Sequence, residues 1–565
     1  MLAKIRSNSP MTGKEQLRLS LMLGLPAILA QLSNILMQYI DASMVGHLGA
    51  TQAASIGLVS SSTWLFGGLC MATTSGFSVQ IAQLLGAGNG RKARDVMRKG
   101  LVSGFVFSIV LGLIGISISS PLPYWLGGKA DIASDASSYF LIYSAAIPFM
   151  QIGLSASGFL AANGNLKVPS IIFATMCLLD VVFNYLFIYI CDMGVMGAAV
   201  GTAAAELFAM AASLWYLLVR SRELNLKQDR LESLILDCRA GRKLNSDESW
   251  QLDDSANQQS GYGTSRQSHL ESRQLDDSAN QQSGYGTSRQ SHLESRQLDD
   301  SANQQSGYGT SRQSHLENRQ LDDSESRQSH LESRQANRSS FKSALGNWLP
   351  DRPVLKNAFG ISGPLWLQNI VMRGAYVIAT IIVAPLGTIA IAANAFAIIA
   401  ESFCYMPGYG MADAVTPLVG QSIGAGRKDY AKRFAWINIG IAGGMMGFLA
   451  VLMYIFAPQM MSLLTSDTEV IALGVKCLRI VAFAEFLYGV SIVGYGACVG
   501  AGDTMIPTVM NFSSMWIVRI GLALILTPKM GLVGYWIAMC IELNARGIIF
   551  ALRIKGNAWL KKSLV

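Results

Sequence analysis

Three long stretches of this sequence contain no charged residue, and each is longer than a helix needs to cross a lipid bilayer. They cover residues 42–90, 374–400 and 434–466. The hydrocarbon core of a bilayer is ~30 Å thick, and about 20 apolar residues cross it as an α-helix. Charged residues make up 14% of the whole chain, against roughly a quarter in soluble domains. We therefore predict an all-α polytopic membrane protein.

Twelve segments of the sequence are predicted to be transmembrane helices. Backbone groups in lipid need hydrogen-bond partners within the protein, and a helix supplies them internally. The predicted ranges are 20–45, 53–78, 100–122, 138–160, 169–190, 195–219, 357–382, 390–418, 434–456, 471–497, 507–526 and 532–552.

Lys and Arg residues gather in alternate connections between these segments. Eighteen lie on one side, without counting the long central loop, and four lie on the other. Cytoplasmic loops carry an excess of Lys and Arg. We therefore expect a multi-pass protein of the inner (plasma) membrane, with both termini and the central loop in the cytoplasm. The net charge of +8 comes with these loops and does not indicate a nucleic-acid partner.

The second half of the chain repeats motifs of the first half at a constant spacing. The Gly-Ala-Gly motif at 86–88 recurs at 424–426, and Pro169 recurs as Pro507, each 338 residues later. Two halves of six spans have the same orientation, so an axis along the membrane normal relates them. We predict two pseudo-symmetric six-helix bundles with a cavity between them.

A low-complexity insert separates the two halves. A 23-residue unit, QLDDSANQQSGYGTSRQSHLESR, begins at Gln251, Gln274 and Gln297, and a shortened copy begins at Gln320. Its few aliphatic residues cannot offset the entropy of ordering, so we expect a disordered cytoplasmic loop. The repeated His residue is compatible with metal binding, but a solvated linker is the simpler interpretation. The predicted domains are the N-terminal bundle at 1–220, the insert at 221–355 and the C-terminal bundle at 356–565.

No catalytic motif is present in the sequence. It contains no GxxxxGK[ST] loop for phosphate, no HExxH and no GxSxG, which are the residues that ATP hydrolysis or proteolysis would need. The eight Cys form no CxxC pair, so a zinc site or a disulfide framework is not expected. We expect neither an enzyme nor a cofactor, and any energy that the protein uses must come from an ion gradient.

Ionisable side chains inside a membrane span are costly and therefore indicate function. The first half has three acidic residues within its spans, Asp41, Asp180 and Glu206, and no Lys or Arg at comparable depth. In the second half the charges balance, and the residues are Glu401, Asp413, Glu485, Glu542, Arg373, Arg519 and Arg546. We therefore expect the cation site in the first half. The secondary candidates are Glu206, Glu401, Glu485 and Arg519, the last as a counter-ion to an acid.

Several short motifs occur in a characteristic order in both halves. They are Leu25-Pro26, Asp41 with the run at 46–49, the runs at 83–88, 179–180 and 184–189, and then 385–387, 406–408, 418–421, 424–426, 502–504 and 518–520. In this order they resemble the multidrug and toxic compound extrusion (MATE) family. The resemblance covers residues 15–220 and 355–555 and excludes the insert.

The resemblance implies export of amphipathic, often cationic drugs or metabolites in exchange for H⁺ or Na⁺. In one branch of the family an acid on the first helix, Asn and Asp on the fifth and Thr on the sixth bind the ion. The matching positions here are Asp41, Asp180, Asn184 and Thr202, with Asp and Asn exchanged in order. A carboxylate pair of another branch is not reproduced, because Met372 and Tyr488 occupy its positions. Pro26 is expected to kink the first helix.

Asp41 and Asp180 in one pocket of low dielectric constant would repel each other. Either one of them keeps a proton near neutral pH, or a sodium ion binds both, with Asn184 and Thr202 completing its oxygen shell. No other metal site is expected. The expected partners are a small-molecule substrate and membrane lipids, and the protein is expected to be a monomer.

Two other functions are compatible with the sequence. One is a flippase for a lipid-linked precursor, which would use a basic cavity for phosphate and is supported by Arg373, Arg519 and Arg546. The other is a membrane scaffold or sensor that acts through the repeat loop.

Overall fold

The computed structural model describes residues 2–6, 9–48, 50–128, 130–221, 223–224, 242–244, 250–252, 348–465 and 467–560. Its helices belong to one compact unit, formed by Met1–Arg230 and Asn347–Val565, and Leu231–Gly346 forms a second unit. The predicted disordered insert at 221–355 lies largely outside the described residues. Between residues 225 and 347 the structure describes two short strands, β1 (Arg242–Leu244) and β2 (Trp250–Leu252), which pair antiparallel.

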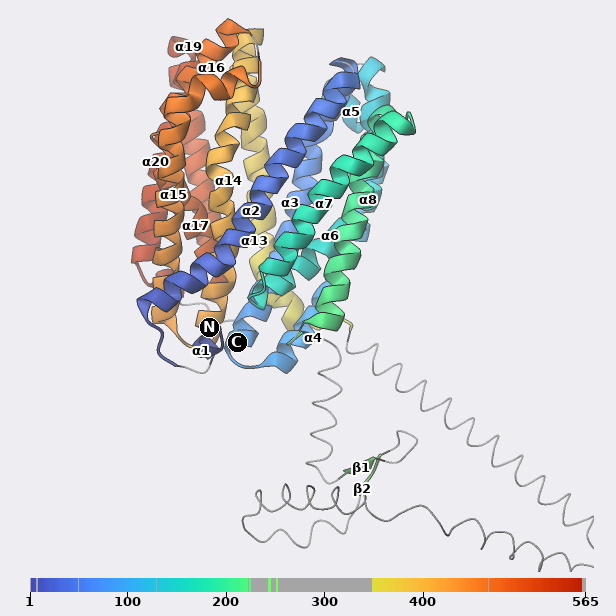
Figure 1. Ribbon diagram of the computed structural model, residues 1–565, viewed down its shortest axis with the longest axis vertical. Helices are drawn as coiled ribbons and strands as arrows, with labels where there is room; N and C mark the ends of the chain where they lie inside the picture. Colours follow the sequence, from blue (N-terminus) through green and yellow to red (C-terminus); the bar gives the residue numbers. More distant parts are fainter. Residues whose placement is uncertain are drawn as a thin grey trace, which may run out of the picture. The chain divides into compact units, whose positions relative to one another are not determined.

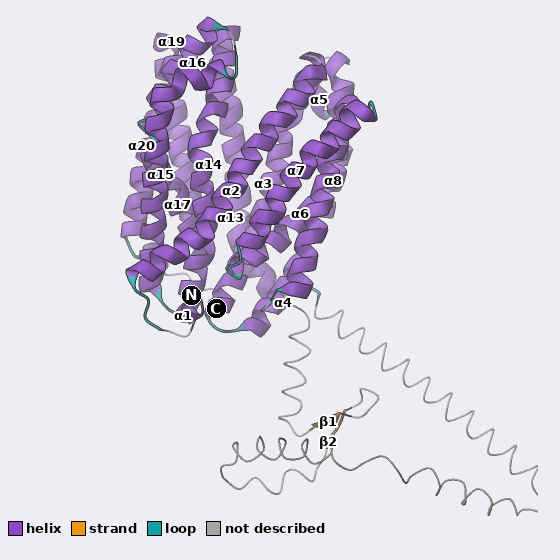
Figure 2. Ribbon diagram, in the orientation of Figure 1, coloured by secondary structure: helices purple, strands orange, loops and turns teal. Residues whose placement is uncertain are grey.

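The compact unit is helical throughout its described residues (Figure 2). The helices of its N-terminal half are α1 (Leu2–Arg6), α2 (Gly13–Leu48), α3 (Ala50–Gly86), α4 (Gly90–Ile118), α5 (Leu122–Trp125), α6 (Ala130–Ala162), α7 (Lys167–Tyr185) with η1 (Leu186–Ile190), and α8 (Gly194–Trp215) with η2 (Tyr216–Arg220).

The C-terminal half repeats this series of helices. They are α13 (Arg352–Val383) with η4 (Ala384–Leu386), α14 (Thr388–Gly424), α15 (Lys428–Ser462), α16 (Thr468–Val481), α17 (Glu485–Gly500), α18 (Met505–Ser513) with η5 (Ser514–Ile520), α19 (Gly521–Met530), α20 (Leu532–Lys555) and η6 (Ala558–Leu560). Both chain termini lie at the same end of the helices (Figure 1), and we call this the inner end.

Each predicted span falls on a helical segment, so the predicted fold class is confirmed. In the described residues, ten helices are long and apolar enough to cross a membrane by length and composition. The helices are longer than the predicted spans: α3, predicted to end at residue 78, continues to Gly86, and α6, predicted to begin at 138, begins at Ala130. Hydropathy marks the part of a helix that suits lipid, whereas backbone hydrogen bonding continues beyond it.

The predicted tenth span at 471–497 consists of two helices in the structure, α16 and α17. The helix breaks between α16 and α17, where Phe483 and Ala484 donate backbone hydrogen bonds to Ile480 and Val481, three residues back. These tighter turns keep the backbone N–H groups bonded. Because any residue can make these backbone hydrogen bonds, the turn contains no glycine or proline that would have revealed it in the sequence.

The backbone of the turns reproduces the sequence repeat. Gly88 and Gly426 have φ angles of 75° and 72°, and Gly164 and Gly502 have 84° and 77°. Each pair is 338 residues apart. Positive φ is a region that glycine adopts at no steric cost, so the two halves end equivalent helices with the same turn.

The two halves meet at the inner end, where α3 crosses α14. A Cβ atom on Gly86 would overlap the backbone carbonyl of Gln421, and one on Gly424 would overlap that of Gln83. The two glutamines also bond across the halves: Gln421 donates to the Ala162 carbonyl at 2.7 Å, and Gln83 donates to the carbonyl of Gly500 at 3.5 Å. The repeat thus forms a pseudo-symmetric joint.

Candidate cation site

The long helix α2 contacts both halves of the compact unit. Near its inner end, Asn438 of α15 donates a hydrogen bond to the Ser20 hydroxyl at 3.0 Å. Near its outer end, the Tyr189 hydroxyl of η1 donates to the Met44 carbonyl at 2.8 Å. Figure 1 shows α2, in blue, running obliquely from α15 towards α7. The helix therefore links the two halves, and a shift of its outer part would change how they lie relative to each other.

Three predicted site residues meet where the outer part of α2 faces α7. The Asn184 amide nitrogen donates one hydrogen bond to Asp41 Oδ1 and another to Asp180 Oδ2, each at 3.0 Å. Asp180 and Asn184 share a face of α7 because four residues separate them, while Asp41 comes from α2. One amide group thus holds two carboxyl groups together.

The protein leaves the charge of this cluster uncompensated. Among the described residues, no Lys, Arg or His forms an ion pair with Asp41 or Asp180. Asp180 and Asn184 are 1% and 2% exposed, and the Oδ1 atom of each accepts no hydrogen bond from the described residues. A buried unsatisfied acceptor costs about 1–3 kcal/mol. The arrangement therefore suits a proton or a small cation.

Thr202 and Glu206 of α8 extend the cluster towards α6. Thr202 interacts with the Asp180 carboxyl group, and Glu206 also acts on it electrostatically. Both residues line a cavity of about 40 Å³, together with Tyr139 and Tyr143 of α6 and apolar side chains of α6 and α8. The four predicted ligand positions and the secondary candidate Glu206 thus form one continuous polar region.

Close helix packing explains how Asn184 reaches both carboxyl groups. Gly201 of α8 faces Asn184, and a Cβ atom at this position would overlap the Asn184 amide oxygen and lie 2.8 Å from its backbone nitrogen. The segment η1, which begins two residues after Asn184, is a π-helical stretch. Such stretches are frequent at functional sites. Sequence analysis missed Gly201; its signal was a glycine one residue before the predicted ligand Thr202.

The acids of the C-terminal half are arranged differently. Glu542 is fully buried and accepts hydrogen bonds from Arg519 at 2.6 Å and 3.0 Å, from Arg546 at 2.7 Å and from Ser514 at 2.5 Å. Two guanidinium groups and a hydroxyl therefore satisfy one carboxylate, and the hydrogen bonds from the guanidinium groups are charge-assisted and therefore strong. Arg519, a secondary candidate, lies in this structural cluster.

The secondary candidates Glu401 and Glu485 lie near each other in the C-terminal half. They are 5% and 0% exposed and act on each other electrostatically. Neither carboxyl oxygen of Glu485 accepts a hydrogen bond of normal geometry from any of the described residues. Asp413, in contrast, is exposed and accepts a hydrogen bond from Gln31 of α2 at 3.3 Å. Glu401 and Glu485 are therefore the alternative to the α2–α7 cluster as the cation site.

Pro26 lies inside α2, and the helix runs through it without a break. Its predicted kink remains a prediction. A proline within a helix leaves one carbonyl group of the preceding turn without its usual partner, which makes this point of α2 easier to bend than its neighbours.

A family model and two curated proteins match this chain. The family model described as MatE matches residues 26–186 and 364–525. The chain is 19% identical over 552 residues to the probable multidrug resistance protein NorM of Thermotoga maritima, covering 96% of this chain and 93% of that protein. It is 25% identical over 236 residues to the multidrug resistance protein MdtK of Yersinia enterocolitica, covering 41% of this chain and 51% of that protein.

Solved structures share the fold. A MOP superfamily transporter from Pyrococcus furiosus has a TM-score of 0.72 at 16% identity, with 100% of this chain and 99% of that chain covered. The Vibrio cholerae MATE transporter VcmN in its bent form has a TM-score of 0.69 at 17% identity, with 97% and 99% covered. At these identities the likeness shows the fold alone.

Proposed function

Because this chain belongs to the MatE family and is a multi-pass membrane protein, we propose that it is a secondary active antiporter. It exports amphipathic, often cationic drugs or metabolites in exchange for H⁺ or Na⁺. The names of its relatives support this function, since two of them are called multidrug resistance proteins. The proposal assigns transport by a monomer and no enzymatic step.

The cluster of Asp41, Asn184 and Asp180 is the observation that carries the proposal. Two carboxyl groups from different helices approach one amide without a basic partner among the described residues. A bound cation or proton lowers their mutual repulsion and so favours the contact between α2 and α7. Loss of the ion weakens that contact. Ion binding therefore shifts the equilibrium between two positions of α2, which is what exchange requires.

The position of α2 supports a coupling between the ion and the substrate. Its inner part is bound to the C-terminal half through Ser20 and Asn438, and its outer part to the N-terminal half through Met44 and Tyr189. A shift of the outer part therefore changes the space between the halves, where we place the substrate. Ion and substrate then compete because each favours a different position of the helix.

Both coupling ions are compatible with the donor set. Oxygen atoms of Asp41, Asp180, Asn184 and Thr202 are ligands that a hard cation such as Na⁺ prefers, and either carboxyl group can take a proton. Purified protein in liposomes, with a proton gradient and a sodium gradient imposed separately, distinguishes the two. The gradient that drives substrate movement identifies the ion, and movement with neither would contradict antiport.

Expression in an efflux-deficient bacterium tests the exported compounds. We expect higher tolerance to ethidium and to fluoroquinolones and faster loss of ethidium fluorescence from loaded cells. A correctly inserted protein that changes neither would contradict the multidrug function. We place the protein in the inner membrane with both termini in the cytoplasm, which reporter fusions at each terminus would check.

The geometry favours drug export over the flippase alternative. Of the three arginines that would make a basic cavity, Arg519 and Arg546 are both bound to Glu542. Only Arg373 stays outside this cluster, and it lies over the ring of Trp64 at 5.1 Å. A transport assay with a fluorescent lipid precursor in the same liposomes would reveal flipping.

A further inference from the structure

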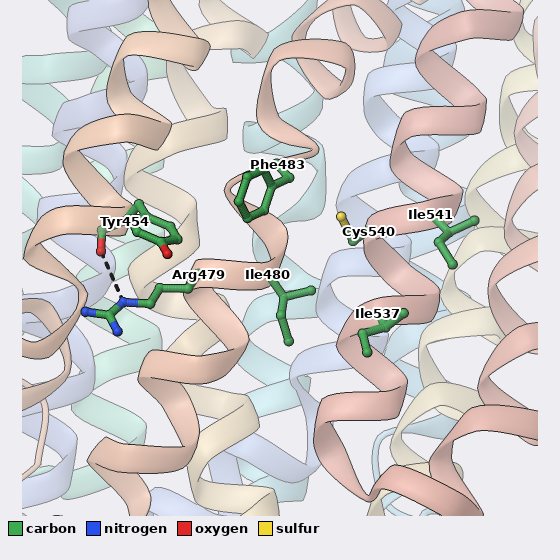
Figure 3. Close-up of a pocket in the computed structure, with 7 residues that line it drawn as sticks. All are labelled: Tyr454, Arg479, Ile480, Phe483, Ile537, Cys540 and Ile541. Atoms are coloured by element: carbon green, nitrogen blue, oxygen red, sulfur yellow. Dashed lines mark hydrogen bonds between the residues drawn. The ribbon is translucent and has the colours of Figure 1, made fainter.

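A groove of about 360 Å³ opens beside the break in the tenth helix. Figure 3 shows Phe483 and Ile480 on one side, Ile537 and Ile541 of α20 on the other, and Arg479 at one end. Phe483, in the turn that separates α16 from α17, is 74% exposed.

The basic end of the groove has no acidic partner within the part of the chain that the structure describes. Arg479 donates a hydrogen bond to the Tyr454 carbonyl at 3.4 Å, and its guanidinium lies 5.3 Å from the centre of the Tyr454 ring. Among the described residues, no carboxylate forms an ion pair with it. Lys476 is also exposed and lies three residues earlier on α16, on the same helix face.

The depth of the groove follows from the helices that form it. Tyr454 lies 21 residues beyond Arg433 on α15, a rise of ~31 Å. If Arg433 marks the inner boundary of the hydrocarbon core, Tyr454 lies at its outer boundary, where tyrosine is enriched. On α20, Ile537 and Ile541 lie about 24 Å and 18 Å from Arg553 by the same rise, and so below that boundary.

The two ends of the groove thus match the two ends of a phospholipid. We propose that the groove binds one phospholipid of the outer leaflet with an anionic headgroup. Arg479 and Lys476 hold the phosphate at the headgroup level, and an acyl chain lies along Ile480, Phe483 and Ile541. A cation facing lipid is costly unless it reaches the headgroups or a counter-ion, and the phosphate supplies that partner. The site is separate from the cation cluster and does not depend on the coupling ion.

Native mass spectrometry of the purified full-length protein tests this site. The probes are phosphatidylglycerol, phosphatidylcholine and water-soluble glycerol phosphate, each titrated into delipidated protein in detergent. We expect the first phosphatidylglycerol to bind about ten-fold more weakly to the double variant Arg479→Gln/Lys476→Gln than to wild type, because each basic residue near an anionic headgroup contributes measurably. Phosphatidylcholine should bind both proteins alike.

A matched control uses Lys529→Gln, which removes an exposed outer lysine of α19 away from the groove and should leave lipid binding unchanged. Phe483→Ser should weaken the binding of phosphatidylglycerol, because it removes an acyl-chain contact and leaves the headgroup contacts unchanged. Equal phosphatidylglycerol binding by wild type and the double variant would overturn the proposal. Displacement of the lipid by glycerol phosphate at equal concentration would overturn it too, since the site would then recognise free phosphate rather than a lipid.

Discussion

Asn184 joins two acidic side chains that the sequence separates by more than a hundred residues. Its single amide nitrogen donates to both Asp41 and Asp180, and its amide oxygen stays available to a ligand. An Asp at this position would add a third negative charge, and a Leu would remove both bonds. The Asn at position 184 therefore keeps the cluster at two acidic groups and holds both of them in place.

The first prediction concerns these carboxyl groups. Asp41→Asn and Asp180→Asn keep the side-chain size but remove the charge that binds the ion, so each should abolish gradient-driven efflux with normal protein in the membrane. Glu401→Gln in the C-terminal half should have a smaller effect. Ethidium efflux from energised cells measures this. If both Asp variants transport like wild type and Glu401→Gln or Glu485→Gln stops transport, the coupling site lies in the C-terminal half.

The second prediction concerns Gly201, which shapes the site without being a ligand. A Cβ atom there overlaps the Asn184 amide, so Gly201→Ala should displace that amide and raise the ion concentration needed for half-maximal transport several-fold. Gly360→Ala is the control, because nothing lies within 4 Å of its Cβ position. An unchanged ion dependence in Gly201→Ala would show that α8 moves aside without disturbing Asn184.

The third prediction separates structural from transport acids. Glu542→Gln leaves Arg519 and Arg546 buried without their carboxylate, and loss of one partner of a buried ion pair costs about 3–5 kcal/mol. We expect a clearly lower melting temperature in detergent. Glu469→Gln, on the exposed first turn of α16, should change it little. Equal melting of the two variants would mean that solvent reaches the Glu542 cluster.

At the scale of elements, helix crossings depend on glycine where the halves meet. The α3–α14 crossing brings Gly86 against the Gln421 carbonyl and Gly424 against that of Gln83. Neither carbonyl can move without breaking its own helix. The crossing thus requires glycine at both positions.

The fourth prediction tests that joint. Gly86→Ala and Gly424→Ala should lower stability despite the better helix propensity of Ala, which is worth about 1 kcal/mol. Gly440→Ala in α15, which has open space at its Cβ position, should keep or raise the melting temperature. The melting temperatures of the three variants in detergent, each compared with wild type, measure this effect. Higher melting temperatures for all three variants would show that the crossing is looser than the structure indicates.

At the scale of the whole molecule, the transport helices and the insert are separate compact units. Every residue of the candidate cation site and of the joint belongs to the helical unit. Transport should therefore not depend on the insert. A scaffold or sensor function, in contrast, would depend on the repeats.

The fifth prediction follows from this separation. Deletion of residues 246–338 should leave ethidium efflux within about two-fold of wild type, since it removes no part of the transport unit. The same deletion combined with Asp41→Asn should be inactive. A complete loss of efflux on deletion, with the protein still in the membrane, would favour the scaffold or sensor.

The sequence by itself determined the helices, the duplication and the excess of acid in the first half. These properties depend on runs of neighbouring residues or on one chain spacing, which hydropathy and motif comparison detect directly. The spans at 357–382 and 434–456, for example, needed no partner to be recognised, and Asp41 and Asp180 stood out because lipid penalises charge wherever the helix packs.

Only the tertiary structure decided which of these residues meet. It bonded Asn184 to both aspartates, placed Arg519 beside Arg546 on one glutamate, brought Gly201 against Asn184, and broke the tenth helix at residues 482–484. Each depends on the packing of helices distant in sequence or on a turn whose hydrogen bonds any residue can make. A pattern of single residues does not contain that information, because the same side chain is a ligand, a counter-ion or a packing contact according to what faces it.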